Sequence, residues 1–130
     1  MDVNIETNFV RTCVRKEYQD RLIFELQSNK RREKALSKFA HSSKTILQEQ
    51  FVTTTMSNLR NNLSSLANST EHCYIISGGI NDGITMALRD AIKQLETSYM
   101  LVILISQNFI VVKEEAEGNT PLVMLLEIKS

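Results

Sequence analysis

The segment CYIISGGINDG, residues 73–83, contains the first glycine of the chain and separates two kinds of sequence. All four glycines and the single proline lie after Ser77. At average composition, about nine such residues would be expected before that point. Residues 1–77 therefore indicate helix-forming sequence, and the residues after them indicate strands, a glycine-marked loop and turns.

The chain of 130 residues has the size of one domain, 1–130, with a helical part at 1–70 and a strand-rich part at 71–130. Its content of 42% apolar and 23% charged residues is typical of a soluble globular protein and excludes a disordered chain. The sequence shows no basic and apolar leader and no apolar segment long enough to cross a bilayer. We therefore expect a cytoplasmic protein with no membrane partner.

Apolar residues recurring every four positions predict a first helix over about 8–27. Ser28 and Asn29 are N-cap candidates for a second helix over 30–41. A heptad-like spacing predicts a third helix from Ser42-Ser43 to Leu66. That helix passes through three threonines at 53–55, whose β-branched side chains lower helix propensity and could break it.

The remaining sequence predicts a strand over 73–77, a helix over 84–95 and strands over 99–105, 109–113 and 122–128. In the last strand, alternation predicts that Leu122, Met124, Leu126 and Ile128 face one way. The predicted fold class is α+β: a three-helix layer (about 8–68) on one face of a four-stranded, mainly antiparallel sheet of β-α-β-β-β order (about 73–129). The β-α-β unit would cross right-handed if its strands were parallel neighbours. The final strand would form an edge available for pairing with a second copy, giving a homodimer, or with a partner.

Net charge is zero, from 15 basic and 15 acidic residues, but it is unevenly spread. Residues 1–70 hold 11 Lys or Arg against 7 Asp or Glu, and residues 71–130 hold 4 against 8. This asymmetry indicates either two surfaces with different partners or two layers that attract each other.

One side of the predicted second helix is basic. At 100° per residue, a contiguous arc contains Lys30, Arg31, Lys34, Lys38 and His41. The like-charge pairs Lys30–Lys34 and Lys34–Lys38 each destabilise an isolated helix by about 0.2–0.5 kcal/mol. The arc is interpreted either as a contact surface for an anion or a phosphate backbone, or as a solvated face whose charges pair within the fold. The arc contains no aromatic residue, which argues against a platform for stacking bases.

The glycine loop is the only segment shaped like a ligand site, and its candidate residues are Gly78, Gly79, Asn81 and Asp82. A strand leading through glycines into a helix N-terminus presents backbone N–H groups to an anion. However, the loop lacks the spacing of a dinucleotide site or a P-loop, and Asp82 would repel an anion. The alternative is a turn that uses glycine for positive φ, with Asp82 or Thr85 capping the next helix.

No metal or cofactor is expected, because the cysteines and histidines form no CxxC or HxxxH pair. Cys13 and Cys73 do not suggest a disulfide scaffold, and a nucleophilic pair of Cys73 with a histidine stays open. The acidic turn with Glu114, Glu115 and Glu117 is either solvated or a contact surface for a basic partner.

We therefore expect a small, non-enzymatic cytosolic protein that binds another macromolecule, most readily a protein, in the manner of an inhibitor, immunity protein or adaptor. The alternative is a nucleic-acid-binding protein that uses the Lys30–Lys38 arc, although an isoelectric point of about 6.7 argues against it. A third hypothesis is a nucleotide-binding or hydrolytic site at Gly78–Gly83.

Overall fold

The fold is α+β, as predicted. The computed structural model describes residues 1–40, 45–66, 71–114 and 122–128. The α-helices in these ranges are α1 (Val3–Cys13), α2 (Lys16–Leu26), α3 (Arg32–Ala40), α4 (Met56–Leu66) and α5 (Leu88–Thr97). The strands are β1 (Val52–Thr54), β2 (His72–Ser77), β3 (Thr85–Ala87), β4 (Val102–Ile105), β5 (Phe109–Lys113) and β6 (Val123–Glu127).

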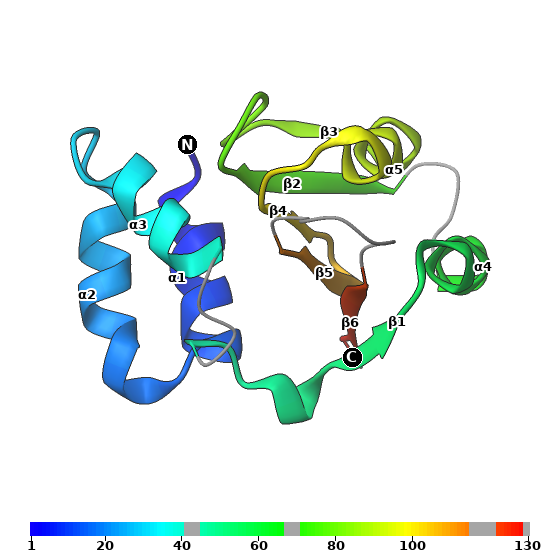
Figure 1. Ribbon diagram of the computed structural model, residues 1–130, viewed down its shortest axis with the longest axis horizontal. Coiled ribbons are helices and arrows are strands. Elements are labelled where there is room, and N and C mark those ends of the chain that lie inside the picture. The colour runs from blue at the N-terminus through cyan, green and yellow to red at the C-terminus, as the bar shows by residue number, and fades with distance from the viewer. Residues whose placement is uncertain (41–44, 67–70, 115–121, 129–130) are drawn as a thin grey trace.

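The single helix predicted over 8–27 is wrong, because the chain forms two helices there, α1 and α2, which lie side by side (Figure 1). The break at Val14 is fixed by a distant segment. Val14 forms a β-bridge with Ile46, and the Arg15 amide donates to the Thr45 carbonyl at 2.8 Å. Val14 continues the apolar periodicity, so nothing local marks the break. The first helix also begins before residue 8, where the Asp2 side chain accepts from the Ile5 amide.

Among the described residues, the third predicted helix is correct only from Met56 onward, and its predicted start at Ser42-Ser43 lies outside them. Before it the chain forms a short 3₁₀ turn, Gln48–Gln50, and then strand β1. Two of the three threonines that lower helix propensity belong to this strand: Thr53 pairs with Met124 and Thr54 with Val123 of β6. The third, Thr55, follows the strand, and its hydroxyl accepts from the Asn58 amide in the first turn of α4. The helical part of the sequence therefore contributes a strand to the sheet.

The sheet has six strands in the described ranges, in the order β1-β6-β5-β4-β2-β3, rather than the four predicted. Every neighbouring pair is antiparallel. The condition for a right-handed β-α-β crossover is therefore not met, since β2 and β4 run antiparallel. The helix predicted from Ile84 begins at Leu88 instead, because residues Thr85–Ala87 form strand β3 against β2.

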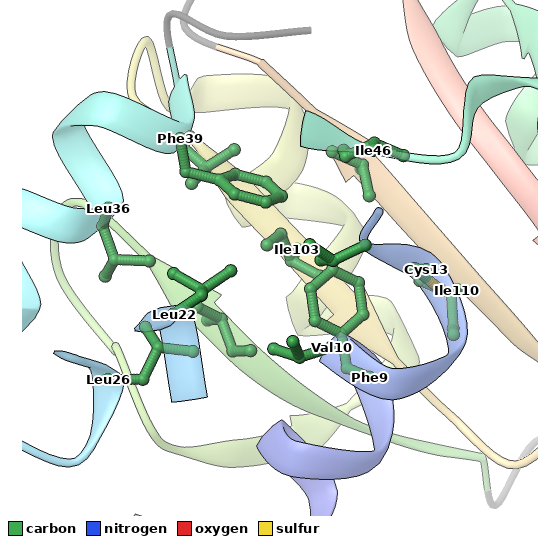
Figure 2. Close-up of a cluster of buried hydrophobic side chains, with 14 of the residues drawn as sticks. Phe9, Val10, Cys13, Leu22, Leu26, Leu36, Phe39, Ile46, Ile103 and Ile110 are labelled. Atoms are coloured by element: carbon green, nitrogen blue, oxygen red, sulfur yellow. The ribbon is translucent and has the colours of Figure 1, made fainter. Parts of the chain in front are cut away.

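Helices cover both faces of the sheet, where the sequence predicted cover on one. On one face, α1–α3 bury a row that includes Ile103 and Val112, and Figure 2 shows side chains from these helices around Ile103 and Ile110. On the other face, α4 and α5 bury a row that includes Leu104 and Val111 (Figure 1). The sheet therefore has a core on each side.

Strand β6 differs from its prediction in two respects. Met124 and Leu126 do face one core, but the alternate residues Val123 and Leu125 are buried in the other core. In addition, β6 lies between β1 and β5, so the prediction that the final strand is an edge is wrong. The edge strands are β1 and β3, each three residues long.

Burial in the second core predicts that truncating a buried residue of α4 lowers the free energy of unfolding strongly. Leu59 is fully buried, so Leu59→Ala should lower the free energy of unfolding by about 2–5 kcal/mol through lost burial and a residual cavity. The neighbouring Asn58 is exposed, and Asn58→Ala should change it by less than about 0.5 kcal/mol. Urea unfolding measures both variants. Equal stabilities of the two would contradict the packing of α4 on the sheet.

Candidate functional site

The predicted basic arc lies on the surface at the start of α3 and along it. Lys30, Arg31, Lys34 and Lys38 are exposed, and we call these four residues the basic face. Lys30 and Arg31 lie in the turn before α3, which begins at Arg32 rather than at Lys30. His41, the fifth residue of the arc, lies outside the described residues.

Within the described part of the chain, no residue of the basic face forms a salt bridge. The nearby carboxylate of Glu25 pairs instead with Arg21, one turn before it on α2. The interpretation that the arc is neutralised inside the fold therefore finds no support among the described residues. Its positive charges point to solvent, where an anionic partner can reach them.

An exposed aromatic ring lies beside the basic face, which the sequence pattern did not indicate. The Arg31 guanidinium carbon lies 5.1 Å from the centroid of the Phe24 ring, within cation–π range. Phe24 belongs to α2 and is 60% exposed. The absence of aromatic residues holds for the arc itself, but the tertiary fold adds one from the neighbouring helix.

The glycine loop does not lead into a helix N-terminus. It closes the hairpin between β2 and β3, where the Gly83 amide donates to the Ile75 carbonyl at 2.7 Å. Asn81 and Gly83 have φ of 65° and 79°, which is the left-handed region that glycine and asparagine tolerate. The predicted turn with positive φ is therefore present. The predicted capping by Asp82 or Thr85 is wrong, since α5 starts at Leu88 and Thr85 belongs to β3.

The loop is also fastened to α5 and to the following connection. The Asn81 amide nitrogen donates to the Gln94 side-chain oxygen at 3.0 Å, and the Gln94 amide nitrogen donates to the Ile80 carbonyl at 2.8 Å. The Gly78 amide donates to the Leu101 carbonyl, and the Gly79 amide donates to Ser77 Oγ. The N–H groups of both glycines therefore have partners inside the protein.

Asp82 binds Arg32, which is buried at the start of α3. Arg32 Nε and Nη2 donate to the two Asp82 oxygens at 2.7 and 2.8 Å. Nη1 and Nη2 donate to the two Glu6 oxygens at 2.6 and 2.8 Å, and Nη1 also donates to the Leu26 carbonyl at 3.0 Å. These bonds number five, which is the number of N–H donors that a guanidinium has.

Tyr74 of β2 and the backbone complete this buried network. The Tyr74 hydroxyl donates to Glu6 at 2.6 Å and accepts from the Asp2 amide, while Asp82 also accepts from the Ser77 amide. Burial, and then the hydrogen bond to Glu6, raise the pKa of Tyr74 to about 12. Burial lowers the pKa of Arg32, but the hydrogen bonds to Asp82 and Glu6 outweigh it and raise that pKa overall. Tyr74 therefore keeps its proton and Arg32 keeps its positive charge at neutral pH.

Neither Arg32 nor Glu6 was singled out from the sequence, although the position of each residue relative to the apolar residues of its helix indicates burial. Arg32 precedes Ala35, Leu36 and Phe39 by 3, 4 and 7 positions, so it lies on the apolar stripe of its helix. Glu6 has the same relation to Phe9, Val10 and Cys13 in α1. Two opposite charges, each on a buried stripe, indicate a buried pair.

The acidic turn is described only in part. Glu114 is half-buried, and burial raises its pKa, while Glu115 and Glu117 lie outside the described residues. The preceding Lys113 is buried, and its Nζ donates to the Leu95 and Ser98 carbonyls at 2.5 and 2.7 Å. Burial lowers the pKa of Lys113. This lysine binds carbonyl groups at the C-terminal end of α5, where the helix dipole favours a cation.

The two cysteines lie in different cores, Cys13 beneath the N-terminal helices and Cys73 beneath α4 and α5. Both are free thiols. Burial raises the pKa of Cys13 to about 12, and burial followed by the charge of Glu71 does the same for Cys73. A Cys73 nucleophile paired with a histidine would need the thiolate. This environment instead keeps the proton on sulfur.

Comparisons with protein-family models, with curated proteins and with solved structures find no match. No described helix is both long and apolar enough to cross a bilayer. Across the described ranges, no three His, Cys, Asp or Glu side chains gather in a way that could hold a metal ion. The basic face therefore has to be interpreted from its own chemistry.

The buried network predicts a strong dependence of stability on Arg32. Arg32→Met would leave the buried Glu6 carboxylate and the partly buried Asp82 carboxylate without their cation, and should lower the free energy of unfolding by about 3–5 kcal/mol. Arg32→Lys should also destabilise, because an ammonium has three donors and no planar fork. Arg21→Met removes an exposed arginine and serves as the control in urea unfolding, with a change below about 1 kcal/mol. Equal effects of Arg32→Met and Arg21→Met would contradict the network.

The thiols predict a loss of stability at alkaline pH. The pKa of each cysteine is raised from 9 to about 12, so over this range the folded protein retains a proton that the unfolded chain releases. Stability therefore falls as pH rises above 9, by about 1.4 kcal/mol per pH unit for each thiol. The raised pKa of Tyr74 also lowers stability as pH rises from 10 to 12. The lowered pKa of Lys113 has the opposite effect below pH 10.5, because there the folded protein releases a proton that the unfolded chain retains.

Cys13→Ala and Cys73→Ala should each make this decline shallower, which urea unfolding at a series of alkaline pH values measures. The quantity to compare is the slope of the free energy of unfolding against pH. The free energy at a single pH is not compared, because each substitution also changes core packing. A slope identical to that of the unaltered protein would show that the thiols do not titrate as described.

Proposed function

We propose that this is a non-enzymatic, cytosolic binding protein of the inhibitor, immunity or adaptor type, and that its basic face binds an acidic surface of a partner protein. The observation that carries the proposal is the set of four exposed cations, Lys30, Arg31, Lys34 and Lys38, none of them ion-paired within the described ranges. Like charges spaced four residues apart on a helix reduce its stability. A partner's carboxylates would remove that repulsion on binding.

The buried network supports this proposal because it fixes the place of the basic face. Arg32, between Arg31 and Lys34 in sequence, is held by five hydrogen bonds to α1, to the end of α2 and to the β2–β3 hairpin. The neighbouring cations are thus presented from a rigid support. Pre-placed charges of this kind steer a complementary surface and speed its association.

Cytosolic location is part of the same proposal. The two thiols are buried on opposite faces of the sheet, where they pack as small apolar groups and cannot reach each other. Unpaired cysteines of this kind suit a reducing compartment.

Nucleic acid is the second candidate partner for the basic face. The observation that favours it is the exposed Phe24 ring under the Arg31 guanidinium, since an aromatic ring beside cations can stack a base while the cations contact phosphate. The net charge of zero counts against it, because nucleic-acid-binding proteins usually have a basic excess.

Binding of a labelled polyglutamate chain and of a labelled DNA duplex, measured by fluorescence anisotropy at low and physiological salt, tests both candidates. We expect polyglutamate binding that weakens with salt and falls about tenfold or more in the double variant Lys34→Glu, Lys38→Glu. The double variant Lys16→Glu, Lys93→Glu is the control. It reverses two exposed lysines outside the basic face and changes net charge by the same amount.

Each outcome separates the candidates. Tighter binding of duplex than of polyglutamate, lost in the same variant, would favour nucleic acid as the partner. Equal losses in the two double variants would show a general charge effect and overturn the assignment to α3. Absence of binding to both probes at low salt would also overturn it.

A further inference from the structure

A groove of about 570 Å³ lies between α1 and one end of the sheet, away from the basic face. Its floor is a row of the sheet in which Thr85 of β3 pairs with Tyr74, Tyr74 with Ile105, and Ile105 with Ile110. Neighbouring strands lie about 4.8 Å apart, so a row across four strands is roughly 14 Å long. The groove is therefore elongated across the strands.

One wall of the groove comes from a single face of α1. Ile5, Asn8, Phe9 and Thr12 line it at spacings of 3, 4 and 7 residues, which places them on one side of a helix. Ile5 and Phe9 continue the apolar floor, while Asn8 and Thr12 are exposed at the rim. The groove thus has an apolar interior and a polar edge.

The lining contains no Lys, Arg, Asp or Glu, although it includes the imidazole of His72, which already interacts with another group of the protein. This distinguishes it from a second groove of about 760 Å³ between α2 and α3, whose lining includes Glu17, Arg21, Glu25 and Lys38. A charged ligand entering the α1 groove would lose hydration without gaining a counter-charge from Lys, Arg, Asp or Glu, so the lining favours an uncharged occupant.

The rim also offers hydrogen-bonding groups that the protein does not use. Asn8, Thr12 and Gln107 line the groove at its rim, and Thr85 lies at the exposed end of the floor; within the described ranges their side chains have no hydrogen-bond partner. Such groups around an apolar floor are typical of small-molecule sites, where they orient a largely apolar ligand.

The size of the groove selects a small molecule rather than a protein. Its volume falls within the roughly 300–1,000 Å³ typical of small-molecule sites. Its twelve lining residues are fewer than the roughly 20–30 that each side of a stable protein interface supplies. We propose that this groove binds an uncharged, elongated and mostly apolar molecule with a terminal hydrogen-bonding group, the chemical class of a medium-chain alcohol. This site shares no residue with the basic face and does not depend on the function proposed for it.

The probe for the experiment is N-phenyl-1-naphthylamine, an uncharged dye whose fluorescence rises in apolar sites, with decanol as competitor. We expect the dye to bind the unaltered protein and decanol to displace it. Asn8→Trp fills the groove from its rim and should weaken dye binding about tenfold or more. Val3→Trp is the control, because it places the same side chain at an exposed position of α1 that does not line the groove and, five residues before Asn8, lies on another side of the helix.

Thr12→Trp fills the groove from the next turn of α1 and provides the test if Asn8→Trp does not fold, as judged by circular dichroism. Decanoate, which has a similar chain and a negative charge, should displace the dye less well than decanol. The proposal is overturned if the dye does not bind, if the groove-filling and control variants bind it equally, or if decanoate competes as well as decanol.

Discussion

Arg32 uses all five of its N–H donors inside the protein, and this requirement governs the arrangement around it. Glu6 must come from α1, Asp82 from the β2–β3 hairpin and a carbonyl from the end of α2. Removing one partner of a buried pair leaves an uncompensated charge, at a cost of about 3–5 kcal/mol. The three N-terminal helices and the hairpin are therefore fixed relative to one another by charge as well as by apolar packing.

This constraint gives the glycine loop a structural purpose. The positive φ of Asn81 and Gly83 lets the hairpin turn tightly, and Asp82 between them enters the interior beside Arg32. An aspartate committed in this way leaves the loop little capacity for an anionic ligand. The same arginine separates the exposed cations at residues 30–31 from those along α3, so one residue links the buried core to the surface that we propose for binding.

The two grooves and the basic face differ in the charge of the side chains that line them. Charged residues line the groove between α2 and α3, beside the proposed protein-binding surface. The groove beside α1 has a lining without Lys, Arg, Asp or Glu and suits a different class of ligand. On the other side of the sheet, Lys113 is committed to carbonyl groups at the end of α5, so this lysine contributes no exposed charge.

The sequence by itself determined the α+β class, the basic arc, the glycine turn and strands β2, β4, β5 and β6, because these depend on local periodicity and on glycine placement. Only the tertiary structure decided the break at Val14, strand β1 and the cover on both faces of the sheet. Val14 pairs with Ile46 and Thr53 pairs with Met124, and the two residues of each pair are far apart in the chain. The local propensity of a segment does not depend on such distant partners, so it cannot predict these pairs. The partners of Arg32 were undetermined for the same reason, since Glu6 and Asp82 lie 26 and 50 residues away from it in sequence.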